Sequence, residues 1–425
     1  MTLRPTYARA VPDRPSVASD RAAVPTLVHE LDLPMLPEND GTIDAETEAI
    51  LRAAAEQSWL ARGAIGYAAL RYDDVVAVLR DKRWHSLLSR LNELRGLPED
   101  MRGESILSAE GEVHTRLRRL VAKAFSPRAA DRLRPFMREV INELIDGVAD
   151  DGRADIVADI CERYPIPIIC ELLGAPREDW QMFSRWAEDT LMIFDADALD
   201  KIDVIRAARN GISEYSLDLI AQRRSDPRPD LLTELIAAEE QGDRLSNDEL
   251  VTMVIAVIVA GTDTTRNQLA CAVAMLAERP EQWALLGRRA DAAPGAVEEL
   301  MRYLGAVRGT GRFASEDIVY RGVLFPAGTV MSVSLAMANH DARVFVDPDV
   351  LDIGKEPAPQ TQLSFGSGIH YCLGAALARA ELQEALPLLA SRMPNLELDG
   401  EVAWKPSTTA IFGPQHLPVT FDPGH

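Results

Sequence analysis

The stretch LSFGSGIHYCLGAALARAEL, residues 363–382, sets one cysteine between a glycine-rich turn and an alanine- and leucine-rich segment. Apolar residues after Gly374 recur every three or four positions, which predicts a helix that starts just beyond Cys372. The unpaired N–H groups and the positive dipole end of a helix stabilise a thiolate, so they lower the pKa of a thiol placed there. Glycines at Gly366 and Gly368 let the backbone turn tightly. The stretch therefore predicts a thiolate presented to a ligand.

Several interpretations of Cys372 follow from the residues alone. A zinc site needs further Cys or His ligands, and His370, two residues away, is a weak candidate for one. A catalytic thiol needs a base histidine and an orienting partner, and the sequence leaves that interpretation open. A buried structural thiol is what most lone cysteines are. The glycine frame lets a flat, bulky group approach closely, which suits a porphyrin better than a bare metal ion.

Composition narrows the class of protein. The 425 residues include 47% hydrophobic side chains, enough to bury a large core. The net charge of −21 argues against nucleic acid or an anionic membrane as a partner. Four cysteines without a CxxC pair indicate a reducing cytoplasm. The longest apolar run, residues 250–261, has about half the length that a bilayer requires. We expect a cytoplasmic, monomeric protein with small-molecule or protein partners.

The periodicity of apolar residues predicts a mainly α protein with a small β part, an α+β fold. Helical spacing runs from about Asp44 to Tyr303, in segments 47–62, 73–84, 114–125, 133–149 and 246–261. Beyond Tyr303, alternation in residues 322–339 and 408–421 predicts two short hairpins. Residues 1–23 form a flexible tail in this prediction, and residues 24–425 form a single domain.

A family resemblance follows from residues 365–374, FGSGIHYCLG. They resemble the haem-binding loop of the cytochrome P450 family, F-G-x-G-x-H-x-C-x-G, and its fixed positions fall on Phe365, Gly366, Gly368, His370, Cys372 and Gly374. The resemblance extends from about Val24 to the end of the chain. It implies the P450 fold, a large helical domain and a small β-rich region around a buried haem b. It also implies that Cys372 is the proximal iron ligand, with Phe365 packed beside the sulfur.

A second motif, AGTDTT at residues 260–265, interrupts the apolar run. Gly and back-bonding Thr weaken a helical ladder and predict a local bulge. The motif resembles the A-G-x-[DE]-T-[TS] pattern of the family's distal helix, which implies that Asp263 and Thr264 deliver protons during dioxygen activation. The alternative is an N-cap or turn between two helices, but the helical pattern continues through residues 266–276.

Charged residues complete the resemblance. Glu299 and Arg302 match the family's E-x-x-R pair, which implies a buried structural lock. Taken singly, each basic residue is more often a solvated surface group. Taken with the haem loop, the cations that the resemblance assigns to the haem carboxylates are His114, Arg118, Arg312 and His370.

The sequence departs from the family pattern at several structural positions. Residues 108–116, SAEGEVHTR, lack the usual Asp-Pro-Pro lead, and Gln362 replaces a common histidine. Val350 and Leu351 stand where an Arg-Phe pair often closes the lock. The lock therefore lacks its usual third partner unless Arg343 or His340 takes that place.

The implied function is a haem-thiolate monooxygenase that inserts one oxygen atom from O2 into a hydrophobic small molecule, by hydroxylation or epoxidation. Its electrons come from NAD(P)H through a ferredoxin reductase and a ferredoxin. Some basic residues of 114–128 are not assigned to the haem, and we expect them to form the docking surface for the electron donor: Arg116, Arg119 and Lys123. The alternative is that they form an ordinary solvated face. A haem-binding sensor or carrier without turnover is the alternative function.

Residues 83–108 and 186–200 resist assignment to helix or strand and are apolar, so we expect them to form a movable roof over the active site. Position and apolarity predict these residues of the substrate pocket: Leu87, Leu88, Leu91, Ile193, Phe194, Val257, Ala260, Val307, Ile411 and Phe412. Few cations occur among them apart from Arg308 nearby, so a terpenoid, steroid, fatty acid or polyketide-like compound is expected rather than a highly charged one.

Overall fold

The computed structural model describes residues 24–37, 45–90, 96, 98, 105–194, 197–240, 246–356, 358–406 and 411–423. The predicted tail, residues 1–23, lies outside these ranges, as do Leu91 and the side chain of Phe194. The prediction of one domain over residues 24–425 stays a prediction.

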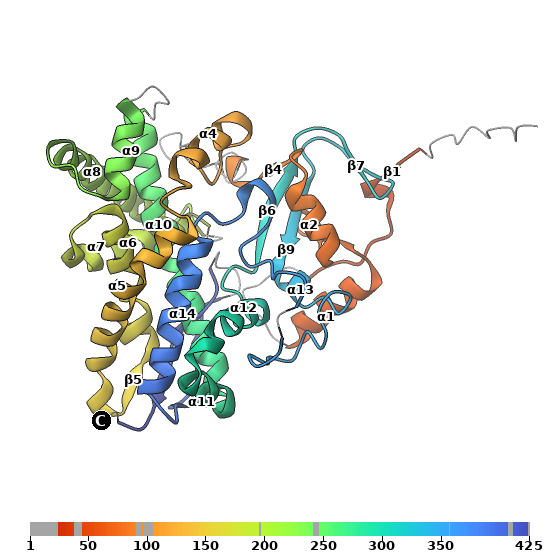
Figure 1. The fold of residues 1–425 in the computed structure, drawn as a ribbon. Helices are drawn as coiled ribbons and strands as arrows, with labels where there is room; N and C mark the ends of the chain where they lie inside the picture. The colour runs from red at the N-terminus through yellow and green to blue at the C-terminus, as the bar shows by residue number, and fades with distance from the viewer. Residues whose placement is uncertain are drawn as a thin grey trace, which may run out of the picture.

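Most of the described helices form one side of the molecule, around the long helix α10 (Figure 1). α10 (Asn247–Ala277) packs against α6 (Pro165–Leu173), α7 (Trp180–Leu191) and α8 (Ile202–Ser225). α14 (Ala375–Arg392) lies beside α5 (Pro127–Asp146). The same side holds α4 (Gly111–Val121), α9 (Leu231–Glu240), α11 (Pro280–Arg288) and α12 (Ala293–Tyr303). None of the helices in the described ranges is long and apolar enough to cross a membrane.

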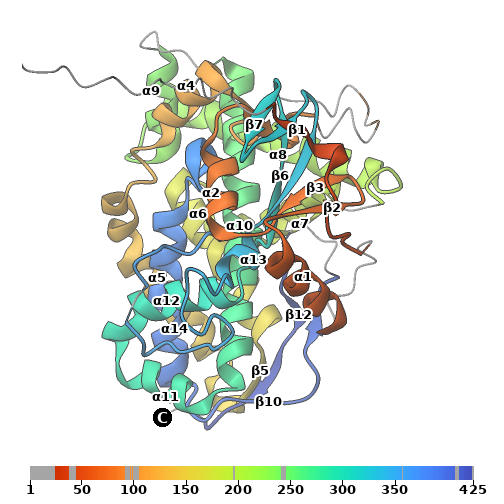
Figure 2. The same ribbon diagram turned by 90° about the vertical axis from the view of Figure 1, so that its right-hand side faces the viewer.

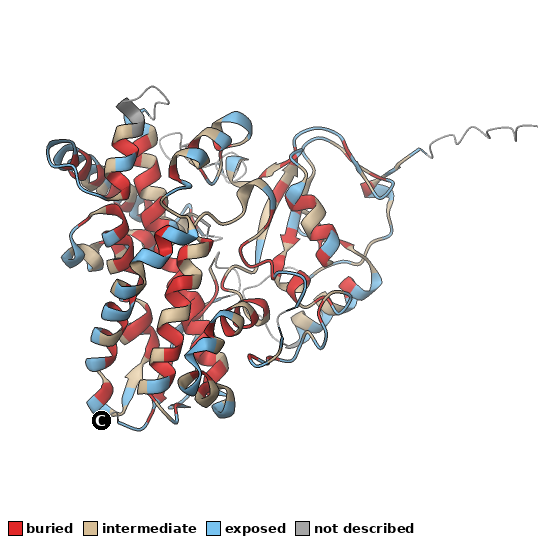
Figure 3. Ribbon diagram, in the orientation of Figure 1, coloured by how far each residue is buried: buried red, intermediate tan, exposed pale blue. Residues whose placement is uncertain are grey.

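Local sequence explains where the main helices begin. At the start of α10, Ser246 Oγ accepts a hydrogen bond from Glu249 N, and the Glu249 side chain accepts one from Ser246 N, a capping box. At the start of α5, Ser126 Oγ accepts from Ala129 N, and Pro127 occupies the first helical position. The faces that these helices turn toward one another are buried (Figure 3).

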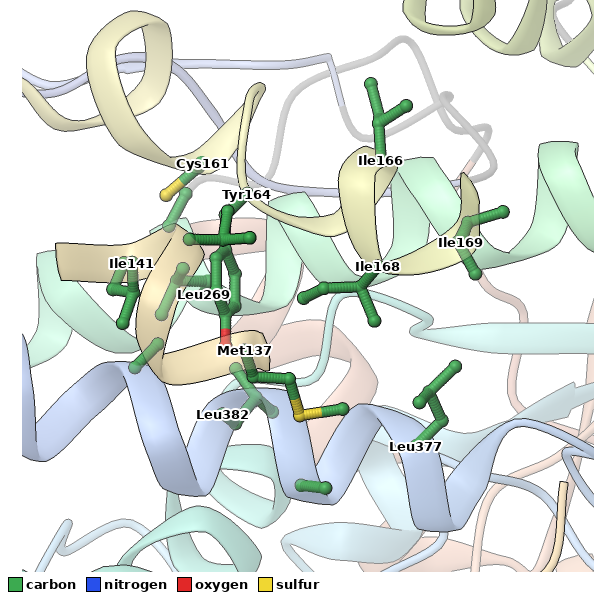
Figure 4. Packing of buried hydrophobic residues seen from close by; sticks show 14 of the residues in the cluster. Met137, Ile141, Cys161, Tyr164, Ile166, Ile168, Ile169, Leu269, Leu377 and Leu382 are labelled. Atoms are coloured by element: carbon green, nitrogen blue, oxygen red, sulfur yellow. The ribbon is translucent and has the colours of Figure 1, made fainter. Parts of the chain in front are cut away.

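The core between α5, α6, α10 and α14 is mainly apolar (Figure 4). Met137, Ile168 and Leu382 line it from three helices, and each is almost fully buried. The Tyr164 hydroxyl donates to the carbonyl oxygen of Glu381 at 3.0 Å, so its one polar group is satisfied inside the core. This packing fixes the start of α14, where Cys372 lies, against α10.

The β-rich side carries a five-stranded sheet in the order β2-β3-β9-β6-β4 (Figure 2). Its strands are β2 (Leu60–Gly63), β3 (Gly66–Ala69), β9 (Val330–Ser334), β6 (Gly309–Ala314) and β4 (Trp84–Ser86). The pair β3 and β9 is parallel and the others are antiparallel. The helices on this side are α1 (Ala45–Gln57), α2 (Tyr72–Arg80) and α13 (Leu335–Asn339).

Three smaller sheets complete the described strands. β1 (Thr26–Leu27), β8 (Val323–Phe325) and β7 (Ile318–Tyr320) pair in that order, and so do β10 (Glu397–Leu398), β13 (Pro418–Thr420) and β5 (Arg153–Asp155). β11 (Ala403–Trp404) pairs with β12 (Pro414–His416).

The α+β class is confirmed, but several local predictions are wrong. Residues 322–339 do not form a hairpin, since β8 pairs with β7 and β1, whereas β9 pairs with β6 and β3. The helix predicted over residues 47–62 ends at Gln57, and residues 60–63 form β2 because they pair with β3. Residues 408–421 do not form a hairpin, since β12 pairs with β11 and β13 with β5 and β10. α10 is continuous through residues 260–265, so the bulge is absent. Gly261 instead allows close packing, because a Cβ there would overlap the Ile169 side chain of α6.

Candidate active site

The loop before α14 is held in a fixed shape by two glycines and by its neighbours. Gly366 and Gly368 have φ of 70° and 73°, the left-handed region that favours glycine. A Cβ on Gly368 would overlap the carbonyl oxygen of Leu79 at the end of α2. Cys372 N donates to the carbonyl oxygen of Phe365 at 2.9 Å. The loop thus presents Cys372 three residues before α14 begins.

The electrostatics of the Cys372 thiol differ from the sequence-based expectation. Burial raises its pKa above the usual value, and this outweighs the N–H of Gly374 and the nearby guanidinium groups of Arg118 and Arg379, which lower it. The prediction of a lowered pKa is therefore wrong for the thiol itself. The thiolate that a haem iron requires must come from coordination, because a metal cation deprotonates a coordinating thiol outright.

On α10, the carboxylate of Asp263 and the hydroxyl of Thr264 have different surroundings. The buried Asp263 Oδ1 lies 2.5 Å from Arg266 Nη2 and 3.7 Å from Lys405 Nζ. The Thr264 hydroxyl donates to the carbonyl oxygen of Ala260 at 2.7 Å. Ala260 is exposed and Thr264 half-buried, so this face of α10 is open to a ligand.

The four predicted haem-carboxylate cations come from three parts of the chain. His114 on α4 is buried, and its ring centroid lies 4.5 Å from that of His370 in the cysteine loop. Burial lowers the pKa of His114, and the nearby His370 and Arg118 lower it further. Arg118 lines a cavity of about 560 Å³ with Cys372. Arg312 on β6 is buried, and its guanidinium donates to its own strand, to Thr310 Oγ1 at 3.1 Å and to a backbone carbonyl.

Glu110 is a carboxylate of this region that the sequence did not single out. Its Oε1 lies 3.0 Å from His370 Nε2 and accepts a hydrogen bond from Ser86 N. Burial raises the pKa of Glu110, but these two partners outweigh burial and the net pKa is below the usual value. Glu110 comes directly before α4, within the stretch that departs from the family's Asp-Pro-Pro lead. That departure is the sequence feature that could have pointed to Glu110.

These residues fit a flat, dicarboxylate cofactor such as haem. No acidic partner of the buried Arg312 occurs among the residues that the structure describes. No atom lies within 4 Å of the position that a Cβ on Gly366 would take, and the one nearest Gly374 is Cys372 Sγ at 4.0 Å. The described residues therefore offer such a group a thiol, open space beside the glycines of its loop, and a buried guanidinium with no hydrogen-bonded acid.

The pair Glu299 and Arg302 on α12 is a buried, bidentate ion pair with two contacts of 2.8 Å. Arg302 Nη1 also donates to the carbonyl oxygens of Asn339 and Pro348. The third partner is Lys355, whose Nζ lies 2.6 Å from Glu299 Oε1.

Neither residue suggested for that place contacts Glu299. Arg343 pairs with Asp341 and Glu56. His340 Nδ1 contacts Asp349 at 2.8 Å. Gln362 donates to Glu298 Oε2 at 3.2 Å, so it adds a contact to α12 from the start of the cysteine loop.

The predicted pocket residues are distributed over several elements. The ring of Phe412 stacks on Trp404 at 5.3 Å, and Phe412 N donates to Ala306 O, beside Val307. Leu87 packs against β6 at Gly311. The remaining described members are Leu88 and Ile411, both half-buried, Val257 in the large core, and Ile193 in a small cluster with Met192, Ala198, Ile202 and Ile205.

The cations proposed for donor docking are not equally available. Arg116 is engaged in an ion pair with Glu249 at the start of α10. Lys123 is largely exposed and lies 3.6 Å from Glu234. Arg119, which lies on α4 with Arg116, is exposed.

Comparison with known proteins gives consistent matches. The family model described as Cytochrome P450 matches residues 68–286 and 293–397. Nocardicin C N-oxygenase of Nocardia uniformis subsp. tsuyamanensis is 40% identical over 83% of this chain and 88% of its own length. Mycinamicin IV hydroxylase/epoxidase of Micromonospora griseorubida is 39% identical over 88% and 93%. The crystal structure of CalO2 superposes with a TM-score of 0.83 at 31% identity and covers 90% of this chain and 98% of that one.

Proposed function

The chain belongs to the cytochrome P450 family, and we propose that it is a haem b-dependent monooxygenase acting on an apolar small molecule, with electrons from NAD(P)H by way of a ferredoxin. The observation that carries the proposal is the glycine-framed loop that presents Cys372 directly before α14, in a chain whose helix α10 keeps an open face around Thr264. Relatives named as an oxygenase and as a hydroxylase/epoxidase support the reaction class.

The roles proposed for the residues follow from their surroundings. Cys372 ligates the iron, and Phe365 packs beside its sulfur. Haem, when bound, supplies the oxygen-activating redox chemistry. His114, Arg118, Arg312 and His370 hold its carboxylates.

Proton transfer is assigned to α10. Asp263, anchored by Arg266 and Lys405, keeps a fixed carboxylate near the helix face, and the Thr264 hydroxyl orients a proton donor there. The buried Glu299, Arg302 and Lys355 keep α12 joined to the segment before the cysteine loop.

The oligomeric state and the cellular location are proposed from the composition of the chain. Acidic charge and four unpaired cysteines support a monomeric, cytoplasmic protein. Arg119 and Lys123 on and after α4 are the cations proposed to meet an acidic ferredoxin, because both are exposed, whereas Arg116 is half-buried and paired with Glu249.

The test is the absorption spectrum of the dithionite-reduced protein with carbon monoxide. A Soret band at the wavelength that gives the family its name is expected, and Cys372→Ser should abolish it. Arg289→Gln, an exposed substitution, serves as the matched control and should leave the band unchanged. A band typical of histidine- or thiol-ligated haem in the native protein would overturn the thiolate assignment.

A further inference from the structure

Arg308, between α12 and β6, is a half-buried arginine that has no hydrogen-bonding or ion-pair partner among the residues that the structure describes. No hydrogen bond or ion pair joins its guanidinium to any residue within the described ranges. Its one specific contact is the ring of Phe412, 5.2 Å from the guanidinium carbon. An arginine carries five N–H donors, and burying them unpaired is unfavourable.

The position of Arg308 follows from the β6 ladder. Ala336 N donates to the carbonyl oxygen of Arg308 at 2.9 Å, so the pairing with the β9 side continues through it. Side chains alternate along a strand, which puts Arg308, Thr310 and Arg312 on one face of β6. The hydrogen bond from Arg312 to Thr310 agrees with this arrangement.

The surroundings of Arg308 belong to the proposed substrate pocket. Phe412 N donates to Ala306 O, which ties the two pocket segments together. Gln268 on α10 accepts from Ala306 N at 2.9 Å, so both segments are anchored about one turn beyond Thr264.

Neither the haem carboxylates nor a protein acid explains this arginine. Arg308 lies about 13 Å along the strand from Arg312, too far for both to hold one carboxylate. Glu48 acts on it electrostatically but is paired with Arg52 at 2.5 Å. Lys405, the other cation near Phe412, is directed to Asp263.

We propose, resting on the proposed function, that Arg308 binds a carboxylate of the substrate, which is therefore an amphipathic acid with an apolar body and one anionic group. A guanidinium offers two parallel N–H donors to a carboxylate. One guanidinium matches one negative charge. The Phe412 ring holds the guanidinium in place while the apolar body of the substrate packs on the remaining pocket residues.

The test uses ligands anchored on the iron, so that the natural substrate need not be known. The probes are ω-imidazolyl alkanoic acids of several chain lengths and their methyl esters, and the dissociation constant is read from the shift of the Soret band. We expect the native protein to bind the acid of best length about tenfold or more tightly than its ester. Arg308→Gln should remove this preference, Arg308→Lys should keep part of it, and the exposed control Arg289→Gln should keep all of it.

The outcomes separate the two proposals. Ester binding without a preference for the acid, or a preference that persists in Arg308→Gln, overturns the role of Arg308. A native protein that shifts with neither probe contradicts the proposed function instead. The unfolding midpoint of Arg308→Gln should equal or exceed that of the native protein, because the substitution removes an unpaired buried charge. If Arg308→Gln lowers the unfolding midpoint and keeps the native preference for the acid over its ester, Arg308 has a structural role only.

Discussion

Lys355 Nζ lies 2.6 Å from Glu299 Oε1, on the carboxylate that Arg302 holds through two contacts of 2.8 Å. Burial raises the pKa of Glu299, but the two cations outweigh burial and keep it below its usual value. The carboxylate therefore stays charged inside the protein and connects α12 to the chain before the cysteine loop. This lysine takes the place for which Arg343 and His340 were the sequence-based candidates.

Lys355→Met should lower the free energy of unfolding by about 1 kcal/mol, because it removes one of two cations from a buried carboxylate. Arg343→Met should lower it by about 0.5 kcal/mol or less, since the Arg343 side chain is exposed and its buried partner Asp341 also accepts hydrogen bonds from the N–H groups of Tyr72 and Arg343. Urea unfolding of both variants measures the difference. A loss in Arg343→Met equal to that in Lys355→Met would contradict the assignment.

Gly368→Ala and Gly374→Ala form a matched pair within the cysteine loop. Gly368 has φ of 73° and no room for a Cβ beside Leu79 O, whereas Gly374 has φ of −81°. Gly368→Ala should therefore destabilise the protein by about 2 kcal/mol or more, and Gly374→Ala by about 0.5 kcal/mol. Thermal unfolding compares them, and equal losses would show that the turn geometry is not the reason for Gly368.

Glu381 predicts a pH-dependent stability. It is fully buried on α14, accepts a hydrogen bond from Thr265 at 3.3 Å, and burial raises its pKa to about 8. An unfolded glutamate has a pKa of about 4.3. Between these values the folded protein holds one more proton than the unfolded chain, so this group's contribution to stability is lost as pH rises toward about 8.

Glu381→Gln should remove that contribution. Relative to the native protein, the variant should gain stability as pH rises, by up to about 1.4 kcal/mol per unit and on the order of 2–4 kcal/mol in total by about pH 8. Urea unfolding of both proteins at several pH values gives the difference in the free energy of unfolding. A difference that does not change with pH would refute the raised pKa.

Local sequence patterns identified the candidate residues of the site, but they did not identify the residues that surround and support it. Cys372 and the 260–265 motif were recognisable because each is a short run of unusual residue types. Lys355 was not, since it reaches Glu299 from an irregular segment with no periodicity. Residues 60–63 continue a helical spacing, and only their partners in β3 make them a strand. Likewise, helix position alone suggested a low pKa for Cys372, whereas burial, which depends on tertiary packing, raises it.

Thr264→Ala tests the role of the open α10 face directly. Among the described residues, the one hydrogen bond of the Thr264 hydroxyl is to the carbonyl oxygen of Ala260 in its own helix, so its removal should leave the free energy of unfolding within about 0.5 kcal/mol of the native value. Product formed per electron pair should fall at least tenfold, with hydrogen peroxide released in its place, because proton transfer by a positioned group commonly contributes about 100-fold or more. Thr264→Ser keeps a hydroxyl and should retain most of the coupling. Unchanged coupling in Thr264→Ala across a panel of substrates would favour a haem-binding sensor or carrier over a monooxygenase.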